Sequence, residues 1–229
     1  MNSKNKKIIR QKIFSAFFGS VSLPENIIVI TPINKIFKTI KNSFPLIKET
    51  KGWWERAVVK IDSSLVTILK IPSGTNYIRD CLDALDPRII KGIIFLGYCA
   101  SFSKEIKIGQ IVIPAQAFFG KRKINLFTPK LFGFSKNKRY KIVLVQRLLL
   151  PRRKIRKIEA QLGDMETYFL YKFSKLKNIP TLSLLIITDN PLFSPFYYIS
   201  ESDKIKINSS IKKLTGLLRR YVYKFQKTK

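Results

Sequence analysis

Short apolar runs alternate with amphipathic stretches along most of the chain. The runs have the length and β-branched composition of buried strands, and turn residues bound them. Segment 26–44 predicts a short strand, a turn and a helix, and the last stretch predicts a long helix with Ser202 as its N-cap. The alternation predicts an α/β fold with helices on both faces of a sheet. Further strands are predicted at 57–61, 64–71, 91–97, 110–119, 140–146 and 180–189, and helices at 74–85, 165–176 and 202–225.

Three segments of small or polar residues follow predicted strands. They are 72–74, 97–100 and 188–189. In open α/β sheets, ligands bind beyond the carboxyl ends of the strands. The pattern therefore predicts a ligand site at one edge of the sheet.

The chain of 229 residues fits one domain, 1–229, because no repeat or low-complexity linker divides it. Segment 1–25 begins with "MNSKNKKIIRQK" and is expected to form a basic N-terminal arm or a first helix. A weak secretory signal is the alternative, because a short apolar stretch follows the basic residues. No apolar run reaches the roughly 20 residues that span a bilayer, so we expect no membrane partner.

The residue types restrict the chemistry that this chain can perform. It contains no histidine, which excludes Ser-His-Asp and Cys-His systems and His-ligated zinc. Acid–base steps would fall to carboxylates, Lys, Tyr or Cys. Cys81 and Cys99 have neither metal-binding nor disulfide spacing, so they suit a reducing, cytoplasmic location.

The formal net charge is +30, from 44 Lys and Arg against 14 Asp and Glu. Such a charge favours nonspecific attraction to polyanions. The basic residues are spread through nearly every segment, with the densest patches at 120–127 and 151–157. This spread favours compositional drift over a dedicated nucleic-acid face, although both interpretations remain open.

Two of the few acids lie where a site is expected. Glu166 begins a predicted helix, where the helix dipole stabilises a negative charge, and Asp189 ends a predicted strand, where it would either cap a helix or face a ligand. Met165 would more often belong to a core. Gly74 and Gly97 would often only mark turns. The residue types alone leave these alternatives open.

In order and spacing, these motifs resemble the nucleoside phosphorylase/nucleosidase superfamily. The resemblance covers about residues 64–190 and rests on "LKIPSGTNYIRDCLDAL", "IIKGIIFLGYCASFSKEIKIGQIVIP" and "GDMETYFLYKFSKLKNIPTLSLLIITDNPL". The variants "GYCASF" and "TDNPL" are most similar to the AMP nucleosidase and methylthioadenosine/S-adenosylhomocysteine nucleosidase branches. The resemblance implies a three-layer αβα fold with a central mixed, largely parallel sheet.

The resemblance also implies roles for particular residues. Glu166 would accept hydrogen bonds from the ribose hydroxyls, and Met165 would pack under the sugar. Asp189, with Thr188 in place of the usual Ser, would protonate a purine at N7 as the N-glycosidic bond breaks. Gly74, Gly97 and Tyr98 would belong to the substrate-binding turns. The family implies a purine nucleoside or nucleotide substrate, no metal, no cofactor other than phosphate as a co-substrate, and a homo-oligomer.

The chain departs from the family pattern at several places, among them Tyr98 in place of the small residue after Gly97 and Ala100-Ser101 in place of the paired glycines. The loop after the first strand lacks the acid that activates water, and Glu49 and Glu55 are the nearest substitutes along the chain. Phe95 occupies the position of the phosphate-binding Arg. The purine-wall motif is not recognisable, and Leu149 and Leu150 are its nearest candidates.

Three hypotheses follow from the sequence. The first is purine N-glycosidic bond cleavage by a nucleosidase or phosphorylase, with hydrolysis favoured over phosphorolysis because of Phe95. The second is a catalytically degenerate homologue that binds a nucleoside or has a structural role. The third is a basic nucleic-acid-binding protein on an α/β scaffold.

Overall fold

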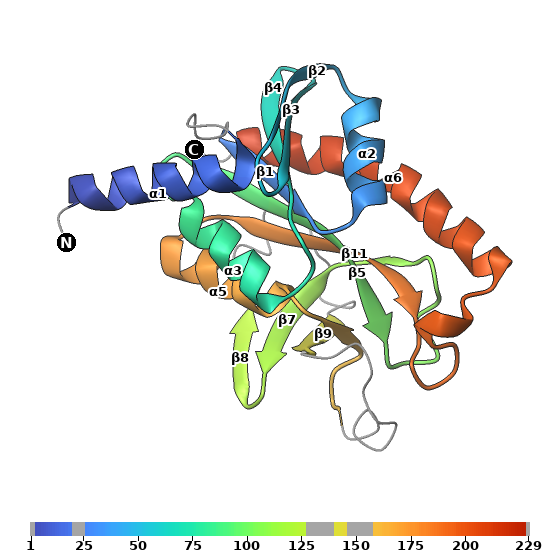
Figure 1. Cartoon of the computed structure of the whole chain (residues 1–229). Helices are drawn as coiled ribbons and strands as arrows, with labels where there is room; N and C mark the ends of the chain where they lie inside the picture. The colour runs from blue at the N-terminus through green and yellow to red at the C-terminus, as the bar shows by residue number, and fades with distance from the viewer. Residues whose placement is uncertain (1–2, 20–25, 127–139, 146–157, 228–229) are drawn as a thin grey trace.

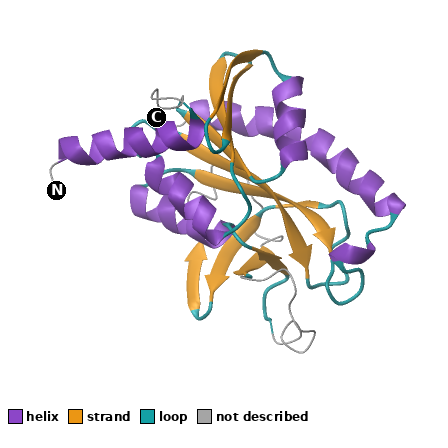
Figure 2. Cartoon of the chain, in the orientation of Figure 1, coloured by secondary structure: helices purple, strands orange, loops and turns teal. Residues whose placement is uncertain are grey.

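The structure is a computed structural model that describes residues 3–19, 26–126, 140–145 and 158–227. Helices flank a central sheet (Figure 1, Figure 2). Helix α3 contacts both α1 and α5 in one group, and α2 contacts α6 in a second group. The helices are α1 (Ser3–Phe18), α2 (Asn34–Ser43), α3 (Thr75–Ala84), α5 (Thr167–Lys177), α6 (Glu201–Gln226) and the 3-10 turn η2 (Phe196–Tyr198).

The described strands form one mixed sheet with the order β2-β3-β4-β1-β5-β10-β9-β7-β8, and β11 pairs with β5 and β6. The pairs β1–β4, β1–β5, β5–β11, β9–β10 and β7–β9 are parallel. The predicted three-layer α/β fold with a largely parallel sheet is confirmed. The strands are β1 (Ile27–Thr31), β2 (Leu46–Lys51), β3 (Glu55–Ile61), β4 (Ser64–Lys70), β5 (Gly92–Ser101), β6 (Ile111–Val112), β7 (Pro114–Phe119), β8 (Arg122–Asn125), β9 (Tyr140–Leu144), β10 (Leu162–Asp164) and β11 (Thr181–Asp189).

The central strands are continuous apolar runs because helices cover both of their faces. All of β1 is buried, and so is β11 apart from Thr188. Apolar residues of α6 recur at helical spacing and pack onto this core, from Ile207 to Phe225. The buried apolar side chains form one continuous cluster that also includes Phe14 and Phe18 of α1. Segment 1–25 was expected to form a basic arm or a first helix; the structure has helix α1 over Ser3–Phe18, and the second half of α1 is part of the core.

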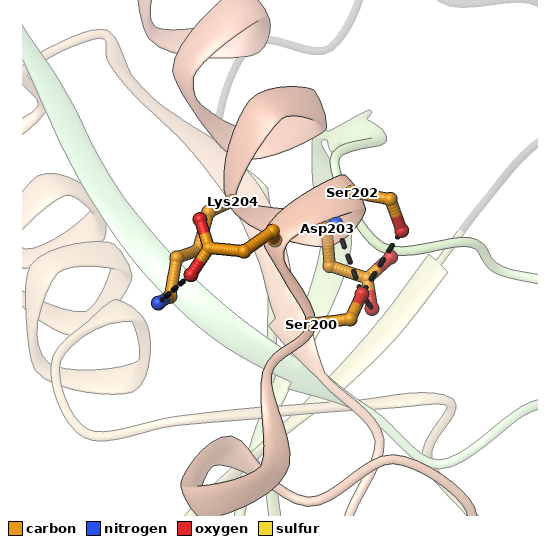
Figure 3. Close-up of polar contacts among 5 residues, drawn as sticks. Ser200, Ser202, Asp203 and Lys204 are labelled. Atoms are coloured by element: carbon orange, nitrogen blue, oxygen red, sulfur yellow. Dashed lines mark hydrogen bonds and ion pairs between the residues drawn. The ribbon is translucent and has the colours of Figure 1, made fainter.

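The N-cap of helix α6 lies two residues earlier than predicted. Ser200 is the N-cap, and its hydroxyl oxygen accepts a hydrogen bond from the Asp203 backbone N–H at 3.2 Å (Figure 3). The prediction of Ser202 as the cap was therefore wrong. Ser202 lies in the first turn, where it contacts the Ser200 hydroxyl. Extended backbone at Ser200 leaves its side chain free to reach the first-turn amide, as an N-cap requires.

The predicted strand 110–119 is two strands. Strand β6 pairs with β11, whereas β7 pairs with β8 and β9. The change of partner falls at Pro114, which has no N–H to donate to a ladder. Within the described residues, no helix is both long and apolar enough to cross a membrane.

Candidate active site

A cavity of about 450 Å³ opens where β5 changes its neighbour. The first half of β5 pairs with β1 up to Phe95, and its end pairs with β10 at Ala100 and Ser101. The stretch between these pairings, with Tyr98 and Cys99, borders the cavity. The other walls come from the loops after β1 and β4, from residues 163–166, from the end of β11 and from the start of α6. Segments far apart in the sequence therefore meet at one edge of the sheet.

Glu166 lies at the entrance to α5, at the N-cap position rather than in the first turn. Its Oε1 accepts a hydrogen bond from the Gly74 N–H at 2.7 Å, and its Oε2 accepts one from the Met165 N–H at 3.2 Å. Burial raises the pKa of Glu166, and these two amide bonds oppose the rise because they favour the ionised carboxylate. Gly74 has a φ of 124°, a conformation suited to glycine, and its amide is aimed at the carboxylate.

Asp189 ends β11 beside an irregularity in the pairing with β5. Its Oδ1 accepts a hydrogen bond from the Thr188 hydroxyl at 2.9 Å, and burial raises its pKa. Residues 190–194 form a turn, and the next helical residue is Phe196. Asp189 therefore does not cap a helix. The other interpretation, a carboxylate that faces a ligand, is compatible with its position in the cavity wall.

A third carboxylate, that of Asp164, also borders the cavity, and sequence reasoning missed it. Its Oδ2 accepts hydrogen bonds from the Thr167 N–H at 3.0 Å and from the Thr167 hydroxyl. Its Oδ1 is buried without a hydrogen-bond partner in the part of the chain that the structure describes. Burial and the neighbouring Glu166 raise the pKa of Asp164 to about 8. Two acids in "GDMET" were the only sequence signal.

The cavity brings together most of the residues singled out in the sequence. Met165, Glu166, Thr188, Asp189 and Tyr98 line it. Gly74 lies behind Glu166 and is not among the lining residues. Gly97 does not line the cavity either. A Cβ at that position would lie 2.7 Å from the Phe95 ring, so Gly97 permits close packing inside the core.

The structure locates two of the departures from the family pattern. Pro32 and Ile33, from the loop after β1, line the cavity where an acid would be expected, whereas Phe95 is fully buried in the core. The two acids considered as substitutes lie elsewhere. Glu49 pairs with Lys41 at 2.7 Å, Glu55 pairs with Lys70 at 3.0 Å, and neither lines the cavity. Leu149 and Leu150 lie outside the described residues.

The remaining wall is largely apolar. Ile33, Phe102, Pro191, Phe196 and Ile199 provide most of it. Lys204 is the only cationic side chain among the described lining residues, and no arginine is among them. No group of three or more His, Cys, Asp and Glu in the described ranges could hold a metal ion. Carboxylates against an apolar wall suit a ligand that joins a hydroxyl-rich part to a planar apolar part.

No protein-family model matches the chain, and no curated protein is significantly similar to it in sequence. Solved structures do match its fold. The Campylobacter jejuni 5'-methylthioadenosine/S-adenosyl homocysteine nucleosidase has a TM-score of 0.69 at 12% identity, over 86% of this chain and 97% of that chain. The native futalosine hydrolase of Helicobacter pylori also has a TM-score of 0.69 at 12% identity, over 88% and 99%.

A uridine phosphorylase from Vibrio fischeri has a TM-score of 0.67 at 12% identity, over 86% of this chain and 90% of that chain. The chain therefore has the fold of the nucleoside phosphorylase/nucleosidase superfamily, as the motifs implied. At this identity the likeness shows the fold alone, so any activity must be argued from the cavity.

Proposed function

We propose that this protein cleaves the N-glycosidic bond of a purine nucleoside or nucleotide. One observation carries the proposal: Glu166 and Asp189, from two distant segments, line the same cavity. The proposed reaction requires one carboxylate that binds the sugar and another that protonates the base. If the two side chains lined separate cavities, a single nucleoside could not reach both.

Glu166 is suited to hold the sugar. Each of its oxygens accepts one backbone N–H, and each carboxylate oxygen has a further lone pair. A ribose 2',3'-diol offers two O–H donors, which such a carboxylate can accept as charge-assisted hydrogen bonds. The backbone amides fix the carboxylate before the substrate arrives, so less entropy is lost on binding.

Asp189 is suited to donate a proton. Because burial raises its pKa, its protonated form persists to higher pH than that of an exposed Asp. In the proposed step the C1'–N9 bond breaks, its electrons move into the purine, and the Asp189 proton passes to N7. The base therefore leaves neutral, and the sugar passes through an oxocarbenium-like state.

Hydrolysis is the favoured outcome for the sugar. Phosphorolysis needs a firmly held phosphate, and the described lining residues include no arginine for it. In hydrolysis, water attacks C1' and loses a proton to solvent or to a carboxylate. A homo-oligomeric state and a cytoplasmic location stay predictions.

A nucleoside-binding protein with little turnover is the second candidate. The observation that favours it is the loop after β1, which presents Pro32 and Ile33 to the cavity instead of an acid. Loss of a positioned base typically lowers a rate by about 10²–10⁴. The fold and the sugar carboxylate would still permit binding.

Purified protein incubated with a panel of nucleosides and nucleoside monophosphates, with and without phosphate, distinguishes these candidates. Release of a free purine supports cleavage. Dependence on phosphate would identify phosphorolysis. Thermal stabilisation by a nucleoside without base release would support the binding candidate.

Two variants test the residue roles. Asp189→Asn is expected to lower the rate of base release by about 10²-fold or more while the protein stays folded. Glu166→Gln should raise KM and lower kcat together, because the sugar contact is present in the ground state and strengthens in the oxocarbenium-like transition state. Asp83→Asn, which changes an exposed carboxylate on α3, is the matched control. If both cavity variants turned over like the parent, the proposed roles would be wrong.

A further inference from the structure

Helix α1 is anchored only in part. Phe14 and Phe18, in its second half, are fully buried in the core. Its N-terminal half projects from the body of the protein (Figure 1). Ile8, Ile9 and Ile13 on this helix are 43%, 44% and 37% exposed. These are large apolar side chains on a helix that already has its own anchor.

Part of this surface forms a continuous row that we name the α1 stripe: Ile9, Ile13, Phe17 and Trp53. The first three recur every four residues and so lie on one side of the helix. The ring centroids of Phe17 and Trp53 are 5.8 Å apart, so the row continues onto the turn between β2 and β3. Trp53 at its end is 77% exposed.

The exposed position of Trp53 is fixed by the fold. Its backbone N–H donates to the Ala16 carbonyl at 3.1 Å, and the Trp54 N–H donates to the Phe17 carbonyl at 2.7 Å. The Trp54 ring also stacks on Phe17, with centroids 4.1 Å apart. The turn is thereby fastened to the end of α1. An exposed tryptophan whose backbone is fixed in this way is typical of an interaction surface.

The composition of α1 indicates what covers the stripe. Helix α1 contains Lys4, Lys6, Lys7, Arg10 and Lys12 and no acidic residue. A second copy of a chain with a net charge of +30 would repel this surface. A nucleic acid would satisfy the charge, and its bases could stack on Trp53, but it would leave the isoleucines in water. An anionic lipid bilayer accommodates both features, because its headgroups attract the lysines and its interface accepts Ile and Trp.

We propose that α1 and Trp53 dock this protein on anionic lipid surfaces. The helix lies in the interfacial plane with the α1 stripe toward the acyl chains, and it does not span the bilayer. This departs from the expectation of no membrane partner, which rested on the absence of a spanning segment. The proposal does not depend on the cleavage reaction.

Vesicle binding tests the proposal, and the variants must separate insertion from simple charge attraction. A basic protein of this kind will approach any anionic vesicle, so the α1 stripe is altered without changing the charge. The double variant Ile9→Asn, Ile13→Asn is compared with Leu176→Asn, which removes an apolar side chain of α5 that is 69% exposed. Thermal melting confirms that both variants are folded.

On vesicles with about 30% phosphatidylserine in phosphatidylcholine, the double variant should bind about tenfold more weakly than the parent, and the control variant like the parent. In a Trp54→Phe background, Trp53 emission should shift to the blue on these vesicles. The shift should persist in part at about 0.5 M salt, where charge attraction is screened.

Equal binding of the double variant and the parent, or no change in Trp53 emission, would overturn the proposal, because attachment would then be electrostatic only. Conversion of a parent dimer into a monomer by the double variant would also overturn it, because a second copy would then cover the α1 stripe.

Discussion

Replacing Asp164 with Asn removes one ionisable group from the cavity wall and keeps the size of the side chain. The amide oxygen can still accept the two hydrogen bonds from Thr167. The buried Oδ1, which has no partner among the described residues, is replaced by an uncharged NH₂ group. The variant therefore isolates the cost of ionising a carboxylate at this position.

The magnitude follows from the shift in pKa. Asp164 titrates at about 8 in the folded chain, against an ordinary value of 3.8. Between these values the folded state holds a proton that the unfolded state has released, so the free energy of unfolding falls as pH rises. One group contributes roughly 1.4 kcal/mol per pH unit in that range. Between about pH 5 and about pH 7.5, Asp164→Asn should therefore gain roughly 3 kcal/mol relative to the parent.

Urea unfolding at several pH values, followed by circular dichroism, measures this difference. Lysines and the carboxylates away from the cavity titrate alike in both proteins, so their effects largely cancel between the two curves. Asp83→Asn, on the exposed side of α3, should show no such gain. Unfolding slopes that agree between variants would show that the same surface is exposed in each case.

Parallel stability curves for the parent and Asp164→Asn across this pH range would refute the reasoning. Asp164 would then be ionised throughout in the folded state. The free oxygen would in that case have found a partner, such as water or a bound cation.

The remaining predictions concern the neighbouring parts of the site and α6. Gly74→Ala should lower the free energy of unfolding by about 1–3 kcal/mol and raise KM, because a φ of 124° is strained for alanine and the Glu166 contact would move. Gly216→Ala, in open space on α6, should instead raise the free energy of unfolding by about 0.5–1 kcal/mol. Urea unfolding measures both changes. Ser200→Ala should cost about 1 kcal/mol by the same assay, and Ser202→Ala much less. The kcat for base release should fall as pH rises through the raised pKa of Asp189, and a kcat that rose instead would contradict its role as the acid.

The periodicity of the sequence was sufficient for most of the elements near the site. Apolar runs and helical spacing are local properties, so β1, β5, β11, α3 and α6 could be placed from the chain alone. Short strands could not. Strand β10 has three residues, and it is a strand only because β9 and β5 lie on either side of it. Pairing of that kind is set by neighbours and leaves no pattern in the sequence.

The same distinction applies to the site. The motifs directed attention to Glu166 and Asp189, which both line the cavity, but Asp164 was overlooked. Its relevant properties are burial and an oxygen without a partner, and neither is visible before the chain is folded. Glu49 and Glu55 were considered because they are close to the loop along the sequence, but neither reaches the cavity. Each lies on a strand and forms an ion pair with a lysine, Lys41 for Glu49 and Lys70 for Glu55.

The sequence by itself determined which segments become strands and helices, and it placed acidic residues at the end of one strand and the start of one helix. Only the tertiary structure decided that β5 pairs with β1 in its first half and with β10 at its end, and the cavity opens beside the stretch between these two pairings. It also decided that the Gly74 amide meets Glu166 across two distant segments. The physical reason is that local periodicity fixes the conformation of a segment, whereas burial, pKa and contact between segments depend on which neighbours the packed sheet supplies.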